Sequence, residues 1–297
     1  MPRVSIGLPI YNGENFLADA VESLLAQTFT DFELVLVDNA STDGTAALCE
    51  GFVARDARVR YHRNPKNIGG APNFNLAFQL ADRAPYFKWA AHDDRHLPDF
   101  LAECVKVLDA DPDVVVCHAE SEFIDETGRV VKSYDPELNE VGSPRASTRF
   151  RNLVLSEHWA FDVFGLMRRS VLAETPLHGS YVGSDRVMLA ELGLRGRFHR
   201  VPRVLFQSRD YGGRSIRAQD IRARGGWFNP KLEGKIILPH CRYFFEFART
   251  PLRVPLSVSE RVACWRAVWE WRRENGWLMK EDLQQAIAKL RGRAALG

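Results

Sequence analysis

Residues 4–44, VSIGLPIYNGENFLADAVESLLAQTFTDFELVLVDNASTDG, determine the fold class of this chain. Val4 to Ile10 and Phe32 to Asp38 are short apolar runs, which favour strands covered on both faces. Between them, Glu14 to Gln27 carries apolar residues at i, i+3, i+4, i+7 and i+8, the spacing of one helix face, with Asn12 as the candidate N-terminal cap. Strand, helix and strand in this order predict a βαβ unit.

The same alternation continues to residue 118. Further strand-like runs are Val59 to His62, Tyr86 to Ala91 and Val114 to His118. A second helical stripe, Leu97 to Leu108, includes Pro98, which suits a first helical turn. The repeated unit predicts an α/β fold with a doubly wound, mostly parallel sheet and helices on both faces. Ligands of such sheets bind beyond the carboxyl ends of the strands.

After residue 118 the alternation stops. The pattern predicts a hairpin at 121–133, a loop at 135–148, strand-like pieces at 162–167, 197–201 and 204–208, and a helix near 185–192. From Ile216 onward the chain is basic, aromatic and mostly helical in pattern. We therefore divide it into residues 1–215, with halves 1–118 and 119–215, and a helical C-terminal extension, 216–297.

Composition excludes several protein classes. Apolar residues make up 45% and charged residues 26%, an ordinary balance for a globular protein and not for a disordered or fibrous one. No apolar run approaches the roughly 18 residues of a membrane span, and no signal-peptide core follows Met1, so we expect a cytoplasmic chain. Five scattered cysteines without a CxxC predict free thiols, mostly in the core.

The net charge of +2 conceals two unlike parts. Residues 1–194 hold 18 basic and 29 acidic side chains, whereas residues 195–297 hold 22 and 9. This asymmetry suggests that the second part faces an anion, which could be a phosphate, a lipid headgroup or a nucleic acid.

Polar residues gather where the predicted strands end, at 9–13, 37–44 and 90–94. The first helix lacks a GxGxxG, and no P-loop motif occurs, so dinucleotide binding and P-loop hydrolysis lose their main support. Asp93 and Asp94 directly follow an apolar strand, where two like charges need an offsetting cation or solvent. Hard oxygen ligands favour Mg²⁺ or Mn²⁺, which bridge phosphates, and this suits a diphosphate leaving group.

Taken together, these segments resemble the inverting glycosyltransferases of family 2, which have the GT-A nucleotide-sugar fold. The resemblance is strongest over residues 3–118, and five ordered motifs carry it: 4–12 (VSIGLPIYN), 24–29 (LLAQTF), 37–45 (VDNASTDGT), 64–70 (NPKNIGG) and 92–94 (HDD) with Pro98. It weakens over 119–215. The last 80 or so residues carry no motif of the family.

The resemblance implies a nucleotide site. By similarity, Pro9, Tyr11 and Asn12 wall the base and ribose, and Asp38 accepts a hydrogen bond from a ring N–H of uracil, guanine or thymine. The alternative for the first two is that they only shape the strand-to-helix turn. Residues 67–70, with Asn67, Gly69 and Gly70, would let the backbone approach the nucleotide, or would form an ordinary turn before a helix.

The metal motif of the family reads Asp-x-Asp, and this chain departs from it. Ala91 takes the first place, His92 the middle and Asp93 the second. By motif position Asp93 is the metal ligand and also meets the nucleotide, with Asp94 in support. His92 could substitute for the missing carboxylate, or could simply be hydrogen-bonded beside the strand end.

An inverting transfer needs a general base near the acceptor hydroxyl. The family places an acidic pair at the start of a later helix, and here Asp185 matches the second member while Ser184 replaces the first. Asp185 is therefore the candidate catalytic base. Its alternative role is that of a helix cap or first-turn carboxylate, and the two roles are compatible.

A further departure lies at 209–215 (RDYGGRS), where Tyr211 stands in place of a histidine common in related enzymes. Arg209 and Arg214 could instead neutralise the diphosphate, because guanidinium pairs bidentately with phosphate oxygens.

The C-terminal extension offers a separate hypothesis. In 259–273, Val262, Trp265 and Trp269 fall at i, i+3 and i+7, Trp271 lies nearby and four arginines supply positive charge. Such a segment could make a peripheral contact with the inner face of a membrane, or with a lipid-linked acceptor. The alternative is that the tryptophans are buried against the catalytic domain.

The sequence therefore predicts a metal-assisted, inverting glycosyltransferase that uses a UDP-, GDP- or TDP-sugar, a divalent Mn or Mg ion, and a glycan or lipid-linked acceptor. Ala91 and Tyr211 also leave open a catalytically silent nucleotide-sugar-binding module. We expect no nucleic-acid partner, because the basic residues form no recognisable recognition helix or aromatic RNA-binding motif.

Overall fold

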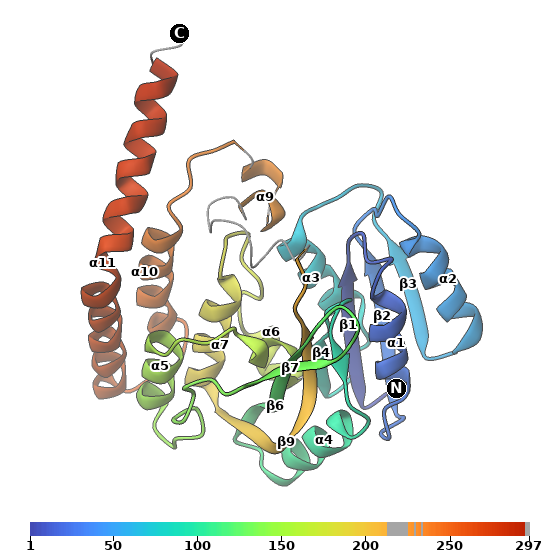
Figure 1. Cartoon of the computed structure of the whole chain (residues 1–297). Coiled ribbons are helices and arrows are strands. Elements are labelled where there is room, and N and C mark those ends of the chain that lie inside the picture. Colours follow the sequence, from blue (N-terminus) through green and yellow to red (C-terminus); the bar gives the residue numbers. More distant parts are fainter. Residues whose placement is uncertain (213–224, 229, 233, 295–297) are drawn as a thin grey trace.

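A nine-stranded sheet forms the centre of the computed structural model, which describes residues 1–212, 225–228, 230–232 and 234–294 (Figure 1). Its strands are β1 (Val4–Ile10), β2 (Phe32–Asp38), β3 (Val59–Arg63), β4 (Tyr86–Trp89), β5 (Arg95–His96), β6 (Val114–Ile124), β7 (Val130–Tyr134), β8 (Leu166–Arg168) and β9 (Arg197–Arg209). They follow the order β3-β2-β1-β4-β8-β6-β9-β5, and β7 pairs with β6.

The sheet is mixed but mostly parallel. Strands β1 to β4 are parallel to one another, and so are β6 and β9. Short β8 is antiparallel to both β4 and β6. The register pairs Ile10 with Asp38, so β1 and β2 end level with each other. Because β1 lies between β2 and β4, the sheet order reverses beside β1, and a ligand crevice is expected there.

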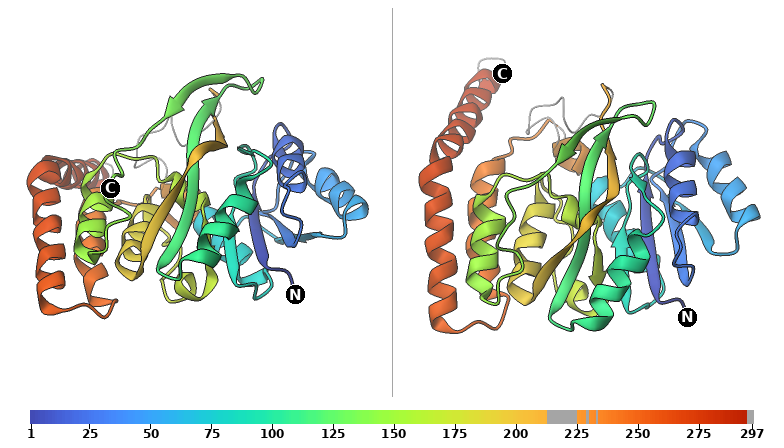
Figure 2. Two further views of the ribbon diagram at one scale, coloured as in Figure 1. Left: turned by 90° about the horizontal axis from the view of Figure 1, so that it is seen from below. Right: turned by 60° about the horizontal axis from the view of Figure 1, so that its bottom comes forward.

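Helices cover both faces of this sheet (Figure 2). They are α1 (Leu17–Leu25), α2 (Thr45–Arg55), α3 (Gly70–Leu80), α4 (Phe100–Ala110), α5 (Ala146–Leu155), α6 (Arg169–Ala173), α7 (Ser184–Arg195), α9 (Gly225–Phe228), α10 (Pro239–Arg249) and α11 (Val258–Ala294), with 3₁₀ turns η1 (Phe161–Phe164), η2 (Pro230–Leu232) and η3 (Thr250–Leu252). Alternate residues of β2 enter different cores: Leu34 packs with the residues of α1, α2 and α4, and Val35 with those of α3, α5 and α7. The α/β prediction with helices on both faces is confirmed.

Several local predictions are also confirmed. The hairpin expected at 121–133 is the β6–β7 pair. The helix expected near 185–192 is α7. All five cysteines are free and four of them are buried.

Other local predictions are wrong, for identifiable reasons. Helix α1 begins only at Leu17, and Asn12 is not its cap but a turn residue with φ of 50°. Pro98 precedes Asp99, the N-cap of α4, and so lies outside the helix. The segment 162–167 begins in η1, whose apolar residues mimic a strand in sequence. The pieces at 197–201 and 204–208 form one strand, β9, which continues past Pro202 with shifts in its register to β6.

The predicted loop at 135–148 ends three residues early, at Arg145, because α5 begins at Ala146. The mainly helical C-terminal extension is confirmed for the residues that the structure describes. There α11 runs alongside α5 and α10, and its C-terminal half continues beyond the end of α10 (Figure 1). The proposed boundary at 215 falls within 213–224, outside the described residues, and stays a prediction.

The extension shares a core with the sheet domain. Cys264, Val268 and Trp271 of α11 and Phe247 of α10 belong to the same buried cluster as Met188 of α7. At the other end of α10, buried Asp282 of α11 accepts the backbone N–H of His240 at 2.7 Å and of Cys241 at 3.1 Å. These N–H groups have no partner within their own helix, so Asp282 caps α10 and fixes α11 against it. Among the described residues, no helix combines the length and apolar character needed to cross a membrane.

Candidate active site at the sheet edge

The loops that follow β1 and β2 are joined by hydrogen bonds. The N–H of Asn12 donates to Ser41 Oγ at 2.9 Å, and Asn12 Oδ1 accepts the N–H of Thr42 at 2.9 Å. The N–H of Gly13 donates to Thr45 Oγ1 at 2.9 Å. Tyr11 points outward, with 40% of its surface exposed. The two loops therefore form one rigid rim, with an aromatic ring presented at its surface.

Asp38 ends β2 and is fully buried. Its Oδ1 accepts the N–H of Ser41 at 2.8 Å, its Oδ2 accepts the hydroxyl of Tyr61 at 2.9 Å, and Arg63 Nε lies 3.4 Å away. Burial, together with this carboxylate, raises the pKa of Tyr61, which stays a neutral donor. The carboxylate is thus held in one orientation. Each oxygen can accept a second bond, and contact with a base stays a prediction.

Four asparagines hold the loop at 64–70. Asn39 donates to Asn67 Oδ1 at 2.9 Å, and its own Oδ1 accepts Asn64 Nδ2 at 3.1 Å and the N–H of Ile68 at 2.9 Å. Asn64 Nδ2 also donates to Asn73 Oδ1 at 2.9 Å. Gly69 adopts φ of 95°, which a side chain would strain. The loop therefore follows β3 and is tied by hydrogen bonds to Asn39, just after β2. Asn73 of α3, which also holds it, was missed by the sequence reasoning.

The turn after β4 carries the acidic pair. Asp93 and Asp94 are 5% and 1% exposed. Asp94 Oδ1 accepts the N–H of Arg209 at 2.9 Å, and the hydroxyl of Tyr211 lies 3.4 Å from Asp93 Oδ2. The end of β9 therefore fixes this turn from one side.

Gly13 allows the β1 and β4 loops to touch. A Cβ at Gly13 would lie 2.9 Å from Cδ2 of His92, so the imidazole rests against this glycine. The ends of β1, β2, β4 and β9 thus meet, as the crevice prediction requires.

Arg209 is buried within this structure, at 2% exposure. Its Nε donates to the carbonyl of Asp93 at 3.0 Å, and its Nη1 donates to the carbonyls of Asp125 and Glu126 at 3.0 Å each. Its Nη2 pairs with Asp19. The guanidinium therefore positions the acidic turn. Contact of Arg209 with a diphosphate stays a prediction, because the guanidinium would have to give up some of these bonds to make it. Arg214 lies outside the described residues.

The donor set fits a cation that arrives with a phosphate ligand. Within the described ranges, no group of three His, Cys, Asp or Glu side chains could hold a metal by itself. Mg²⁺ and Mn²⁺ commonly use one or two carboxylates together with waters and substrate phosphates. Asp93, supported by Asp94, offers that number of carboxylates at the rim. Ligation by His92 stays a prediction.

Asp185 lies in the first turn of α7 and is partly buried. Its Oδ1 accepts the N–H of Arg186 at 2.8 Å. The N-cap is Gly183, with φ of 75°, so Asp185 is a first-turn carboxylate and not the cap. The partly positive helix N-terminus favours a carboxylate at this position.

Tyr243 of α10 closes over the start of α7. A Cβ at Gly183 would lie only 1.4 Å from Tyr243 Oη, so the glycine is required for this approach. The C-terminal extension therefore helps to set the backbone two residues before Asp185. Sequence reasoning found no signal for this contact, because the two residues are distant in the chain.

A buried basic pair lies beneath the acidic turn. Lys88 Nζ lies 2.7 Å from His96 Nε2 and donates to the carbonyl of Trp89 at 3.0 Å. Burial lowers the pKa of Lys88 to about 7 and that of His96 well below its usual value. The pair joins β4 to β5 on either side of the acidic turn. A lysine within a run as short as YFKW gave no sequence signal of burial.

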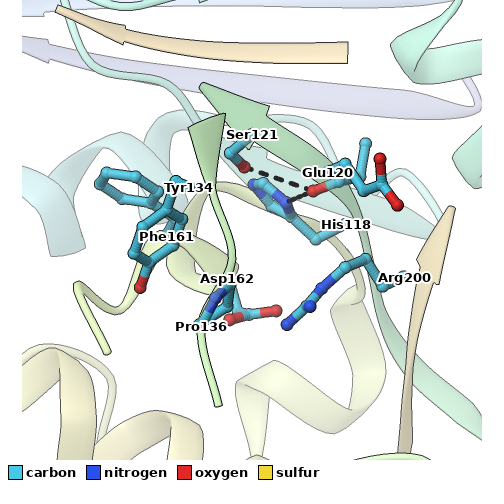
Figure 3. Close-up of a pocket in the computed structure, with 9 residues that line it drawn as sticks. His118, Glu120, Ser121, Tyr134, Pro136, Phe161, Asp162 and Arg200 are labelled. Atoms are coloured by element: carbon cyan, nitrogen blue, oxygen red, sulfur yellow. Dashed lines mark hydrogen bonds between the residues drawn. The ribbon is translucent and has the colours of Figure 1, made fainter. Parts of the chain in front are cut away.

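A small, shallow pocket, partly open to solvent, lies between β6, β9 and η1 (Figure 3). Asp162 and Arg200 face one another across it, and His118 lies deeper, beside Ser121. His118 Nδ1 lies 2.6 Å from the carbonyl of Ala119, and burial lowers the pKa of His118 to about 4. The pocket touches β9 at Arg200, whereas the acidic turn meets the other end of this strand, at Arg209.

Comparisons with known proteins agree with this architecture. Residues 5–175 match the family described as Glycosyl transferase family 2. An uncharacterized glycosyltransferase of Rickettsia felis is 32% identical over 142 residues, which are 46% of this chain and 22% of that protein. The chain thus spans about a fifth of that relative.

Two solved structures share the fold. The structure of S. aureus TarS 1–349 in complex with UDP-GlcNAc matches 97% of this chain and 81% of its own, with a TM-score of 0.65 and 14% identity. The mannosyltransferase PcManGT from Pyrobaculum calidifontis, in complex with GDP-Man and Mn²⁺, matches 100% and 76%, with a TM-score of 0.60 and 19% identity. The matched span covers more than half of the sequence, and the chain belongs to glycosyl transferase family 2.

Proposed function

We propose that this chain transfers a sugar from a nucleoside diphosphate sugar to an acceptor hydroxyl, with inversion and with the help of a divalent cation. The observation that carries the proposal is the position of Asp93 and Asp94, which follow β4 at the edge where β1 and β2 also end. In a chain of this family, carboxylates at that edge suit a cation bound to a diphosphate.

The rim would hold the nucleotide. Tyr11, with Pro9 and Asn12, would wall the base and ribose, and Asp38, already oriented by Ser41 and Tyr61, would accept the ring N–H. The backbone of the loop at 67–69 would approach the nucleotide closely, since Gly69 has no side chain. Because the two solved relatives carry UDP-GlcNAc and GDP-Man, uridine and guanosine diphosphate sugars are the first donors to test, followed by TDP-sugars.

Asp93, supported by Asp94, would hold the cation together with the diphosphate. When bound, Mn²⁺ or Mg²⁺ offsets the negative charge that develops on the leaving diphosphate. Arg209 keeps the turn in place through the carbonyl of Asp93. Arg209 and Arg214 remain proposed as neutralising groups for the diphosphate.

Asp185 would act as the general base. The acceptor oxygen attacks the anomeric carbon while its proton passes to the carboxylate of Asp185, and the bond from that carbon to the diphosphate oxygen breaks. A single displacement of this kind inverts the anomeric configuration. The first turn of α7 fixes the carboxylate, which would place it beside the incoming hydroxyl.

We propose a glycan or a lipid-linked molecule as the acceptor and the cytoplasm as the place of the reaction. No nucleic-acid partner is proposed.

Titration calorimetry tests the donor site. UDP, GDP and TDP are titrated with and without Mn²⁺, and a donor hydrolysis and transfer assay follows. One of the three nucleotides should bind at least tenfold more tightly with Mn²⁺, and its sugar derivative should be consumed. Absence of binding for all three would contradict the proposal.

A catalytically silent nucleotide-sugar-binding module is the second candidate. Ala91, at the first place of the metal motif, and the lack of a three-ligand cluster among the described residues favour it. Tight, cation-dependent binding without hydrolysis or transfer to any of a panel of glycan and lipid-linked acceptors would support this module.

A further inference from the structure

Helix α11 presents an exposed apolar stripe along its length, beside its contact with α10. Its inner face is buried by Cys264, Ala267, Val268 and Trp271. Its outer residues recur at spacings of three and four, which places them along one side of the helix. Six exposed members are Val262, Trp265, Trp269, Leu283, Ile287 and Leu290.

The tryptophans are divided between these faces. Trp271 is 8% exposed, as the alternative of burial against the catalytic domain predicts, but Trp265 and Trp269 are 37% and 59% exposed. Phe244 of α10 lies 6.1 Å from the ring of Trp269, and the neighbouring Phe245 is 55% exposed. The apolar stripe therefore continues onto α10 and is wider than one helix.

Basic side chains border the stripe. Arg266, Arg273, Lys280 and Arg291 are all exposed and recur at intervals of seven or eleven residues, so they line one edge of it. Arg272 lies over the ring of Trp269, at 5.0 Å from its centroid. We call this stripe with its basic edge the outer face of α11.

The acidic residues of α11 lie on its other sides. Glu260 accepts the N–H of Ser147 on α5, Glu270 pairs with Arg151 of α5, and Asp282 caps α10. Glu274 follows Glu270 by four residues, and Glu281 follows Glu274 by seven, so all three lie along the edge of the helix toward α5. No acidic residue of α11 therefore falls within the outer face.

We infer that the outer face of α11 docks on an anionic lipid surface. A helix with basic residues beside tryptophan and aliphatic side chains lies in the interface of a bilayer, with its apolar side among the acyl chains. Each basic residue near such a surface adds attraction to anionic headgroups. The buried side of the helix keeps its contacts with α5 and α10.

A second copy of the chain fits this face less well. Two outer faces brought together would oppose basic edges with no acidic residue between them, which is unfavourable.

Vesicle flotation tests this inference without a donor or an acceptor, so its outcome is separate from that of the proposed function. The full chain is mixed with vesicles of phosphatidylcholine alone, or with ~30% phosphatidylglycerol, at low and high salt. We expect flotation with the anionic vesicles at low salt, less at high salt, and little with phosphatidylcholine alone.

Two pairs of variants locate the contact. Arg266→Glu/Arg273→Glu should reduce vesicle affinity about tenfold or more, whereas Arg83→Glu/Lys106→Glu, with the same change of charge at exposed sites on the sheet domain, should have little effect. Trp269→Ser/Ile287→Ser should also weaken binding, and Val130→Ser/Val131→Ser on β7 should not.

Three results would overturn the inference. They are no flotation of the parent with anionic vesicles at low salt, equal flotation of the α11 and control variants, or a dimer in sedimentation velocity that the Trp269→Ser/Ile287→Ser variant dissociates.

Discussion

The rim at the sheet edge and the outer face of α11 use their polar and apolar residues in opposite ways. At the rim, Asn12, Asp38 and Asn39 bond to neighbouring loops, and Asp93 and Asp94 are nearly buried. On α11 the acidic groups are directed toward the body, and tryptophans remain exposed. We conclude that the rim is built to hold a small ligand in fixed geometry, whereas α11 is built to meet an extended surface.

The contact between Gly183 and Tyr243 connects the two regions. It joins α10 to the turn before Asp185, so the C-terminal extension supports the proposed base even though it carries none of the family motifs. Variants at the rim test the proposed chemistry, and variants at this contact test how far the C-terminal extension supports the position of Asp185.

Asp185→Asn should abolish turnover and leave donor affinity nearly unchanged. Removal of a general base costs about 10²- to 10⁴-fold in rate, while the donor would be held mainly by the loops after β1 and β2. Initial rates of transfer and donor titration measure the two effects. Asp113→Asn, at an exposed carboxylate before β6, should keep the parent rate. Transfer by Asp185→Asn at near the parent rate would show that the base is wrongly assigned.

Gly183→Ala should separate the extension from α7. The added Cβ would overlap Tyr243 Oη, and the positive φ adds strain, so we expect a loss of about 3 kcal/mol or more in unfolding free energy and a large fall in transfer rate. Urea unfolding measures the first. Gly51→Ala on α2, where nothing lies within 4 Å of the new Cβ, should be neutral or slightly stabilising.

The Tyr243→Ala background distinguishes a local clash from a general intolerance of alanine. There Gly183→Ala should cost only the strain of its φ, about 1 kcal/mol or slightly more. An equal cost in both backgrounds would show that the contact with α10 is unimportant.

Asn39→Ala should weaken both the loop at 64–70 and nucleotide binding. It removes bonds to Asn64, Asn67 and Ile68, so we expect a loss of about 1–3 kcal/mol in stability and about tenfold in nucleotide affinity. Asn152→Ala removes a comparable set of bonds on α5 and should lower stability alone. Equal nucleotide affinity in the two variants would remove the loop from the donor site.

Stability should fall as the pH is lowered from about 6.5 to 4. Burial lowers the pKa of His118 to about 4 and that of His178 to about 3, so in this range the unfolded chain binds more protons than the folded one. A tenfold change in proton affinity corresponds to about 1.4 kcal/mol, so each ring contributes about 3 kcal/mol at most over this range. Urea unfolding at several pH values measures the slope, and His178→Phe should reduce it. A flat profile would contradict the burial of these neutral rings.

The sequence predicted the parts that depend on local pattern. Apolar runs and helix-period stripes located β1, β2, β6, α4 and α7, and the motifs pointed to strand ends that the fold brings together. Local patterns and motifs also predicted the family, the α/β architecture and the C-terminal helices.

Features that depend on tertiary contacts could not be predicted from the sequence. The sequence singled out Arg209 for its charge, but it did not show that the guanidinium bonds to the carbonyls of Asp93, Asp125 and Glu126. Contact of Arg209 with a diphosphate stays a prediction. The apolar run at 161–164 has the composition of a strand and forms η1. On α11, Trp271 is buried and Trp269 is exposed. The sequence did not distinguish them, because the side of α11 that is buried depends on where α5 and α10 pack against it.

Calorimetry on Asp93→Asn addresses the acidic turn after β4 itself, which we propose holds a cation together with the diphosphate. In the parent, Mn²⁺ should strengthen binding of the preferred nucleoside diphosphate at least tenfold. In Asp93→Asn that gain should disappear while weak, cation-independent binding persists. The same Mn²⁺ enhancement in parent and variant would show that the turn does not hold the cation.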